Sequence, residues 1–268
     1  PRQFIPDPAY DDVYRDVTLP EPRSAGEAHR RALPDFLKSE NAMVRVRWRL
    51  RFENPDLYQQ SLKNYYRLIY GVDEVLGRIR AELEKKGLAE DTVIALLGDN
   101  GFFLGEYGFA GKWLGYEPSI RVPLVIYDPR LPESRRGRVR SEMALNIDLA
   151  PTFLDYAGLT PPDGTQGNSL LPLVRGESVE WRQDFFYEHL FRVPKAAQER
   201  VGYIPASIGV RTQRYKYLRY IDQTPVYEQL FDLKRDPREE KNLVDSETHQ
   251  EILARLRKRC DELKLECR

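Results

Sequence analysis

The sequence has no net charge, no long apolar run and only two cysteines. Its 42 Lys and Arg residues balance 42 Asp and Glu residues, which argues against a nucleic-acid-binding protein that relies on a general basic field. No apolar run is long enough to cross a bilayer, so we expect no membrane span. The two cysteines, Cys260 and Cys267, would stand about 10 Å apart along one helix, too far for a disulfide. We expect free thiols.

The abundance of charged and aromatic residues is typical of a folded protein with a charged surface. Charged residues make up 31% of the chain, and aromatic residues make up 11%, including 16 tyrosines. An aromatic content of this kind is not typical of a disordered chain. At 268 residues the chain can bury a sizeable core, as one domain or as a domain with a smaller companion.

The most informative stretch is Thr92–Ser119. Its apolar run Val93–Leu97 stops at Gly98-Asp99-Asn100-Gly101, which favours a strand buried on both faces, as in a parallel sheet covered by helices. Ligands of such sheets bind beyond the carboxyl ends of the strands, where Asp99 and Asn100 fall. Two oxygen donors and the nearby ammonium of Lys112 suit a site that holds a divalent cation against an anion.

Other segments show helix and strand patterns. Apolar residues recur at three- and four-residue steps over Leu57–Lys86, which predicts a helix with a buried face that ends at Gly87. Val122–Tyr127 is typical of a second buried strand. Asn146–Gly158 favours a helix with Asp148 as a capping carboxylate near its start.

The sequence pattern changes near Val179. Short β-prone runs follow, and a charged helix is expected near His249–Lys264. The expected strands are Phe185–Glu188, Ser207–Arg211, Tyr215–Tyr220 and Glu228–Leu233.

At the Asp99–Lys112 stretch the chain resembles sulfatases of the alkaline-phosphatase-like superfamily. That family carries Ser/Thr-Asp-Asn/His-Gly at the end of a core strand, then Gly-Glu-X-Gly and Gly-Lys, and then a segment similar to Tyr116–Leu124. All of these motifs occur here in order, and the one departure is Gly98 where Ser or Thr is usual. An isolated Asp-Asn-Gly would be a common turn, but the extended string is specific.

The resemblance implies an α/β fold, the C-terminal part of an alkaline-phosphatase-like α/β sandwich. Residues 1–178 would form the later part of the catalytic domain. Residues 179–268 would form a smaller α+β subdomain, with an antiparallel sheet and a terminal helix. The segment Phe4–Tyr10 resembles one that follows an active-site histidine loop in sulfatases, so the chain is expected to begin just after that histidine.

The same resemblance implies the chemistry of the site. Asp99 and Asn100 would be calcium ligands, and Lys112 would contact the sulfate and stabilise charge in the transition state. The family's nucleophile is a formylglycine made from Cys or Ser in Cys/Ser-X-Pro/Ala-X-Arg, and neither cysteine here is followed by that motif. The nucleophile is therefore expected in a missing N-terminal half, and the chain alone is expected to be inactive.

His189 is a further candidate, for binding substrate. The family often places substrate-recognition residues in this linker toward the C-terminal subdomain. An ordinary, partly buried histidine is the alternative for this position.

The resemblance therefore implies a calcium-dependent sulfuric ester hydrolase that acts on a sulfated small molecule or glycan, with a sulfated carbohydrate favoured. One alternative is a phosphoryl or phosphonate hydrolase of the same superfamily, and another is a non-catalytic, carbohydrate-binding sulfatase remnant. Because the absent half would supply neighbouring strands, we expect either that half as a partner or self-association. Family resemblance points to a periplasmic, extracellular or lysosomal location.

Overall fold

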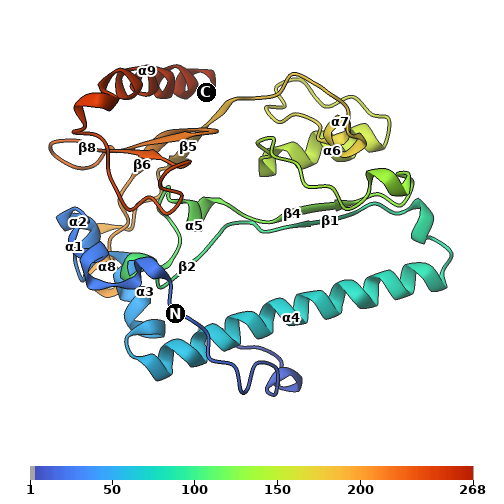
Figure 1. Ribbon diagram of the computed structural model, residues 1–268, viewed down its shortest axis with the longest axis horizontal. Coiled ribbons are helices and arrows are strands. Elements are labelled where there is room, and N and C mark those ends of the chain that lie inside the picture. Colours follow the sequence, from blue (N-terminus) through green and yellow to red (C-terminus); the bar gives the residue numbers. More distant parts are fainter. Residues whose placement is uncertain (1–3, 268) are drawn as a thin grey trace.

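A two-stranded ribbon, a four-stranded antiparallel sheet and one long helix set the layout of the chain, seen here in a computed structural model that describes residues 4–267 (Figure 1). The expected active-site histidine loop would precede Phe4 and concerns residues outside those described. The helices are α1 (Glu27–Arg31), α2 (Asp35–Lys38), α3 (Met43–Phe52), α4 (Pro55–Lys85), α5 (Glu117–Ile120), α6 (Leu149–Tyr156), α7 (Leu171–Arg175), α8 (Lys195–Val201) and α9 (Gln250–Glu266). The strands are β1 (Ile94–Leu97), β2 (Phe103–Leu104), β3 (Ala110–Gly111), β4 (Leu124–Tyr127), β5 (Asp184–His189), β6 (Ser207–Thr212), β7 (Tyr215–Tyr220) and β8 (Tyr227–Asp232).

Strands β1 and β4 form a two-stranded ribbon that leads to the candidate site. They pair antiparallel, with Leu97 opposite Leu124, and the Gly98 N–H extends the pairing by donating to the Pro123 carbonyl at 3.1 Å. The prediction of two strands was right, but the prediction that both were buried, as in a parallel sheet, was wrong. Strand β1 is half-buried throughout, and Val125 and Tyr127 of β4 are exposed. The reason is that, within residues 4–267, β1 pairs with β4 alone.

Helix α4 confirms the predicted helix, with a capped start and a glycine at its end. The Asn54 side chain accepts the N–H of Leu57 at 2.9 Å, which satisfies a donor that the first turn leaves open. Gly87, with φ of +69°, takes the left-handed conformation that commonly follows a helix.

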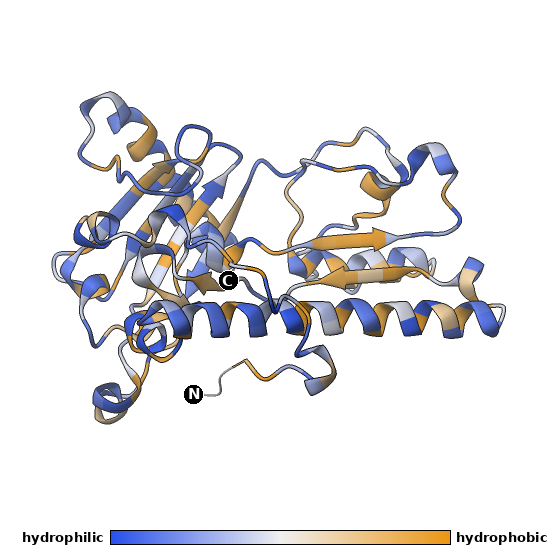
Figure 2. Cartoon of the chain, turned by 60° about the horizontal axis from the view of Figure 1, so that its bottom comes forward, coloured by the Kyte–Doolittle hydropathy of each residue, from blue (hydrophilic) through white to orange (hydrophobic). Residues whose placement is uncertain are grey.

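The apolar stripe of α4 is not core, however, which corrects the expectation of a buried face. Only the first turns are buried, at Tyr58 and Leu62, whereas Ile69 and Val72 are 49% and 48% exposed. Figure 2 shows apolar positions recurring along the helix, which runs beside the β1–β4 ribbon. The prediction that another part of a longer protein or a second copy of the chain covers this stripe stays a prediction.

The second sheet confirms the expected antiparallel subdomain sheet and its terminal helix. Its strand order is β5-β6-β7-β8, with every neighbouring pair antiparallel. Helix α9 covers one face, where Leu253, Leu256 and Cys260 pack against Ile208 and Tyr217. Cys260 is buried and Cys267 is exposed, and both are free thiols, as predicted.

The opposite face of this sheet holds the segment from β2 to α5 in place. Leu218 and Phe231 of the sheet pack against Phe103, Phe109 and Tyr116 of that segment in one buried cluster. Four of these five side chains are aromatic, so the contact buries a large apolar area. The candidate site is therefore anchored to the C-terminal sheet.

Asp148 confirms the capping prediction and also joins distant segments. Its fully buried carboxylate accepts the Leu145 N–H at 2.7 Å, which caps the short 3₁₀ turn before α6, and the Asn168 N–H at 2.9 Å. Arg182 pairs with the same carboxylate at 2.6 Å. A buried carboxylate needs such partners because desolvation of a charge is costly.

No helix within residues 4–267 is both long and apolar enough to span a membrane. The proposed domain boundary at residue 178 stays a prediction.

Candidate active site

The turn at the end of β1 brings the predicted site residues together. Asp99 is exposed, and its carboxylate accepts the Asn100 N–H at 2.8 Å. The Asn100 amide donates to the Gly101 carbonyl at 2.8 Å. This donor bond fixes the amide orientation and leaves Oδ1 to accept from the Lys112 ammonium. Residues twelve positions apart thus meet in a single polar cluster, while their roles as metal ligands and sulfate contact remain predictions.

Gly101 holds this turn against α5, at a distance that only glycine permits. Its N–H donates to the Ser119 carbonyl at 2.8 Å. A Cβ at position 101 would lie 2.1 Å from the Pro118 carbonyl oxygen, well inside van der Waals contact.

Replacing Gly101 by alanine is expected to destabilise the fold by about 1–3 kcal/mol, because the turn and α5 must separate to relieve this overlap. Urea unfolding followed by circular dichroism measures the change. Gly77→Ala is the matched control, since a Cβ there meets nothing within 4 Å and alanine in a helix is favoured by up to about 1 kcal/mol. Equal unfolding free energies for the two variants would contradict the prediction.

The loop that carries Lys112 contains strained and buried groups. Trp113 has φ of +82°, a conformation that bulky residues seldom adopt. Its ring lies against Gly111, where a Cβ would come within 2.6 Å of the indole. Earlier in the loop, the Glu106 carboxylate accepts the Leu104 N–H at 2.6 Å, and burial raises the pKa of Glu106. The packing around Lys112 therefore holds the backbone of the loop in one conformation.

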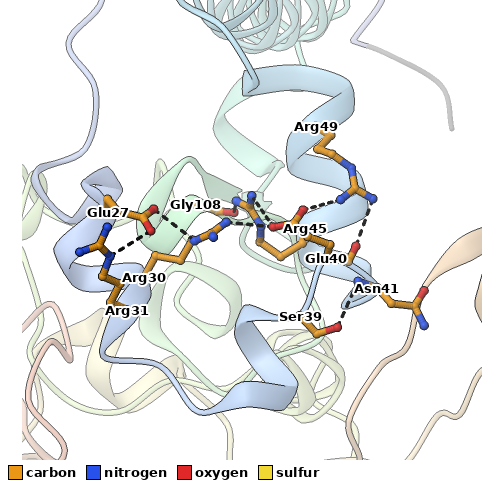
Figure 3. Close-up of polar contacts among 9 residues, drawn as sticks. All are labelled: Glu27, Arg30, Arg31, Ser39, Glu40, Asn41, Arg45, Arg49 and Gly108. Carbon is orange, nitrogen blue, oxygen red and sulfur yellow. Dashed lines mark hydrogen bonds and ion pairs between the residues drawn. The ribbon is translucent and has the colours of Figure 1, made fainter.

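Helix α3 braces this loop from one side. The Arg45 guanidinium donates to the Gly108 carbonyl at 2.6 Å. Glu40 gathers Arg45, Arg30 and Arg49 around its carboxylate, with Arg45 at 3.1 Å and Arg30 at 2.9 Å (Figure 3). A single carboxylate thus organises three cations next to the loop.

A buried ion cluster braces α5 from the other side. The Lys216 ammonium of β7 lies 2.7 Å from both the Glu117 and Glu239 carboxylates, and Glu239 also accepts the Glu117 N–H at 2.6 Å. Lys216 and Glu239 are almost fully buried. Burial raises the pKa of Glu239, whereas for Glu117 the effect of burial is outweighed by Lys216 and Arg211, which lower its pKa.

His189 lies at the end of β5, opposite Ser207 of β6. Burial lowers its pKa, and its Nδ1 is buried with no hydrogen-bond partner among the described residues. Tyr187, two residues earlier and on the same face of the sheet, lies beside Gly115, where an added Cβ would come within 3.1 Å of its ring. Within residues 4–267 no hydrogen bond or ion pair joins His189 to Lys112, and its substrate role stays a prediction.

The donor set at Asp99 and Asn100 fits a hard cation in kind. Carboxylate and amide oxygens are the ligands that calcium prefers. Within residues 4–267 no group of three or more His, Cys, Asp or Glu side chains gathers in a way that could hold a metal ion. Since calcium takes about six to eight oxygen ligands, Asp99 and Asn100 would supply only part of such a site.

Sequence reasoning missed the residues that brace the site. The Lys216–Glu117–Glu239 cluster joins positions about a hundred residues apart, so no local pattern signals it. The alternation of Arg45, Arg47, Arg49 and Arg51 was a visible signal, but a period of two favours a strand and not the helix that forms.

Comparison with known proteins matches both parts of the chain. The sulfatase family model matches residues 9–159, and the model of the C-terminal region of N-sulphoglucosamine sulphohydrolase matches residues 105–266. An N-acetylglucosamine-6-O-sulfatase of Bacteroides thetaiotaomicron is 36% identical over 189 residues, covering 69% of this chain and 32% of that protein. The chain spans about a third to a half of the length of the curated relatives it matches.

Solved structures agree with these matches. A protein solved with its substrate D-glucosamine-2-N,6-O-disulfate superposes with a TM-score of 0.80 at 25% identity, over 99% of this chain and 63% of that one. A phosphonate monoester hydrolase from Silicibacter pomeroyi superposes with a TM-score of 0.82 at 26% identity, over 99% of this chain and 54% of that one. The chain therefore belongs to the sulfatase family of the alkaline-phosphatase-like superfamily.

Proposed function

We propose that this chain is the C-terminal part of a calcium-dependent sulfuric ester hydrolase that acts on a sulfated carbohydrate. Asp99 and Asn100 would hold the ion, and Lys112 would contact the sulfate. The observation that carries the proposal is the contact between Lys112 and Asn100 beside Asp99, at the end of β1. The formylglycine nucleophile would come from residues outside this chain.

The position of Lys112 beside Asn100 supports this proposal. Hydrolysis of a sulfate ester builds negative charge on oxygens, and a fixed cation nearby stabilises it. A bound divalent ion would add further charge stabilisation and would polarise the sulfuryl group. Lys112 donates to the same Asn100 oxygen that would face a cation. Because like charges repel, the ammonium would then turn from Asn100 toward the anionic substrate.

The choice of a sulfated carbohydrate is supported by the relatives. One is named as an N-acetylglucosamine-6-O-sulfatase, and a structural neighbour was solved with a disulfated glucosamine as its substrate. The sugar named in each case is an amino sugar that carries sulfate, so sulfated amino sugars are the first substrates to test.

A second candidate function is phosphonate monoester hydrolysis. The observation in its favour is the superposition with a phosphonate monoester hydrolase over nearly the whole chain. Sulfate and phosphonate monoesters are both tetrahedral anions, and a cation with a lysine can stabilise either of them. A non-catalytic, carbohydrate-binding role is the third possibility, and hydrolysis assays separate all three.

The full-length protein is expected to hydrolyse 4-nitrophenyl sulfate faster than 4-nitrophenyl phenylphosphonate, and to lose activity when EDTA removes calcium. Asp99→Ala should weaken calcium binding by tenfold or more, to order of magnitude, because affinity follows ligand charge and number. Isothermal titration with calcium measures this loss directly. The matched control is Asp73→Ala, which removes an exposed carboxylate on α4, outside the site.

Three outcomes would count against the proposal. One is faster phosphonate than sulfate hydrolysis, and another is activity that EDTA leaves intact. The third is equal calcium affinity in the Asp99→Ala and Asp73→Ala proteins. The 268-residue chain alone is expected to bind calcium weakly and to show no turnover.

A further inference from the structure

Helix α3 carries four arginines at alternate positions, which the helix divides between two sides. Residues four apart share a face of a helix, and residues two apart lie on roughly opposite faces. Arg45 and Arg49 therefore lie on one side, where both pair with Glu40 (Figure 3). Arg47 and Arg51 lie on the other.

That second side faces aromatic rings of the candidate active site. The Arg47 guanidinium carbon lies 5.9 Å from the centroid of the Trp113 ring. The Arg51 guanidinium carbon lies 5.8 Å from the centroid of the Phe102 ring. Trp113 directly follows Lys112, and Phe102 directly follows the turn that carries the proposed metal ligands. Helix α3 also packs on β3, the strand that leads into Lys112.

Arg47 differs from Arg49 in that no carboxylate within residues 4–267 pairs with it. Among residues 4–267, its guanidinium contacts the Trp113 ring and forms no ion pair. The side chain is half-buried, and this burial lowers its pKa. A cation that is withdrawn from water without an anion costs free energy, so a position of this kind is suited to bind an anion.

We infer that Arg47 is a second anion-recognition position beside Lys112, and that it binds a sulfate or carboxylate that the substrate carries in addition to the scissile sulfate ester. The planar guanidinium can donate two parallel hydrogen bonds to such a group. The Trp113 ring beneath it holds the plane in position. The inference rests on the proposed function, since it names the substrate class of that site as polyanionic.

Binding of two saccharides tests this inference; one carries an N-sulfo group where the other carries a neutral N-acetyl group. The full-length protein is titrated with D-glucosamine-2-N,6-O-disulfate and with N-acetylglucosamine-6-O-sulfate, and tryptophan emission is followed. Arg47→Gln is expected to weaken binding of the disulfate by roughly tenfold to a hundredfold, the effect of a hydrogen bond to a charged group. Binding of the monosulfate should change by less than about threefold, as for an exposed charge. Arg47→Lys should restore part of the affinity because it keeps the charge.

The emission change itself locates the second anion. It is expected to disappear in Trp113→Phe, because the proposed anion site lies against this ring and not against Trp48 or Trp181. The same comparison with a 2-O-sulfated uronic acid and its methyl ester shows whether a carboxylate serves in place of a sulfate.

Arg49→Gln is the matched control, since it removes the same charge from the same helix on the side that pairs with Glu40. Equal losses of affinity for both saccharides in Arg47→Gln, or the same pattern in Arg49→Gln, would overturn the inference. Because tryptophan emission reports binding whereas the assays of the proposed function report hydrolysis, the two proposals fail separately. A protein that binds with this pattern and hydrolyses no sulfate ester would refute the proposed function and leave the recognition role of Arg47 standing.

Discussion

Replacing Lys112 by methionine is expected to lower kcat/KM of the full-length protein for 4-nitrophenyl sulfate by roughly a hundredfold to a thousandfold. This is the usual loss when one preorganised donor to a developing anion is removed. The effect is expected mainly in kcat, because the lysine would act most strongly on the transition state. Steady-state kinetics on purified protein measure both parameters.

Two further variants make this result specific. Lys112→Arg should recover part of the rate, since it keeps a cation but changes its shape and reach. Lys85→Met removes an exposed lysine at the end of α4 and should leave the kinetics unchanged. Activity of Lys112→Met within a few-fold of the wild type, to order of magnitude, would show that Lys112 is not part of the catalytic machinery.

Replacing Lys216 by methionine is expected to destabilise the protein by about 3–5 kcal/mol, the range measured when one partner of a buried ion pair is removed. The side chain is 1% exposed, and its loss leaves the Glu239 and Glu117 carboxylates without the cation that lies 2.7 Å from each. Chemical denaturation of the variant gives the free energy of unfolding.

A second substitution separates the loss of charge pairing from the loss of packing. Adding Glu239→Gln to Lys216→Met should recover part of the stability, because it removes one buried, unpaired charge. Lys258→Met is the control for an exposed pair with Glu262, and its expected cost is below about 1 kcal/mol. A Lys216→Met protein as stable as this control would contradict the prediction.

The stability of this cluster bears on the site as well. Glu117 begins α5, and the carbonyls of Pro118 and Ser119 in α5 lie against Gly101. When Lys216→Met loosens α5, the turn that presents Asn100 loses its support. Weaker calcium binding in this variant is therefore expected to accompany its lower stability.

Local patterns were sufficient where the physical signal is local. The apolar run before Asp99, the three- and four-residue steps of α4, and the short strands after residue 179 each depend on side chains close in sequence. The order of the motifs from Asp99 to Lys112 also pointed to the family, which the matches over residues 9–159 and 105–266 show.

Exposure could not be predicted from these patterns, because it depends on what covers an element. An apolar stripe marks one face of α4, but Ile69 and Val72 are still about half exposed. The run that forms β1 was apolar enough for a strand buried on both faces, yet β1 pairs antiparallel with β4 alone among the described strands.

By itself, the sequence indicated helix α4, helix α9 and the strands from β4 onward, pointed to the family, and singled out Asp99, Asn100 and Lys112 as candidates. Only the tertiary structure decided that Lys112 contacts Asn100 and that the Lys216 cluster braces α5. It also decided that α3 is a helix which turns Arg47 toward Trp113. The physical reason is range: backbone conformation and motif spacing depend on neighbouring residues, whereas contacts and burial depend on segments that only the folded chain brings together.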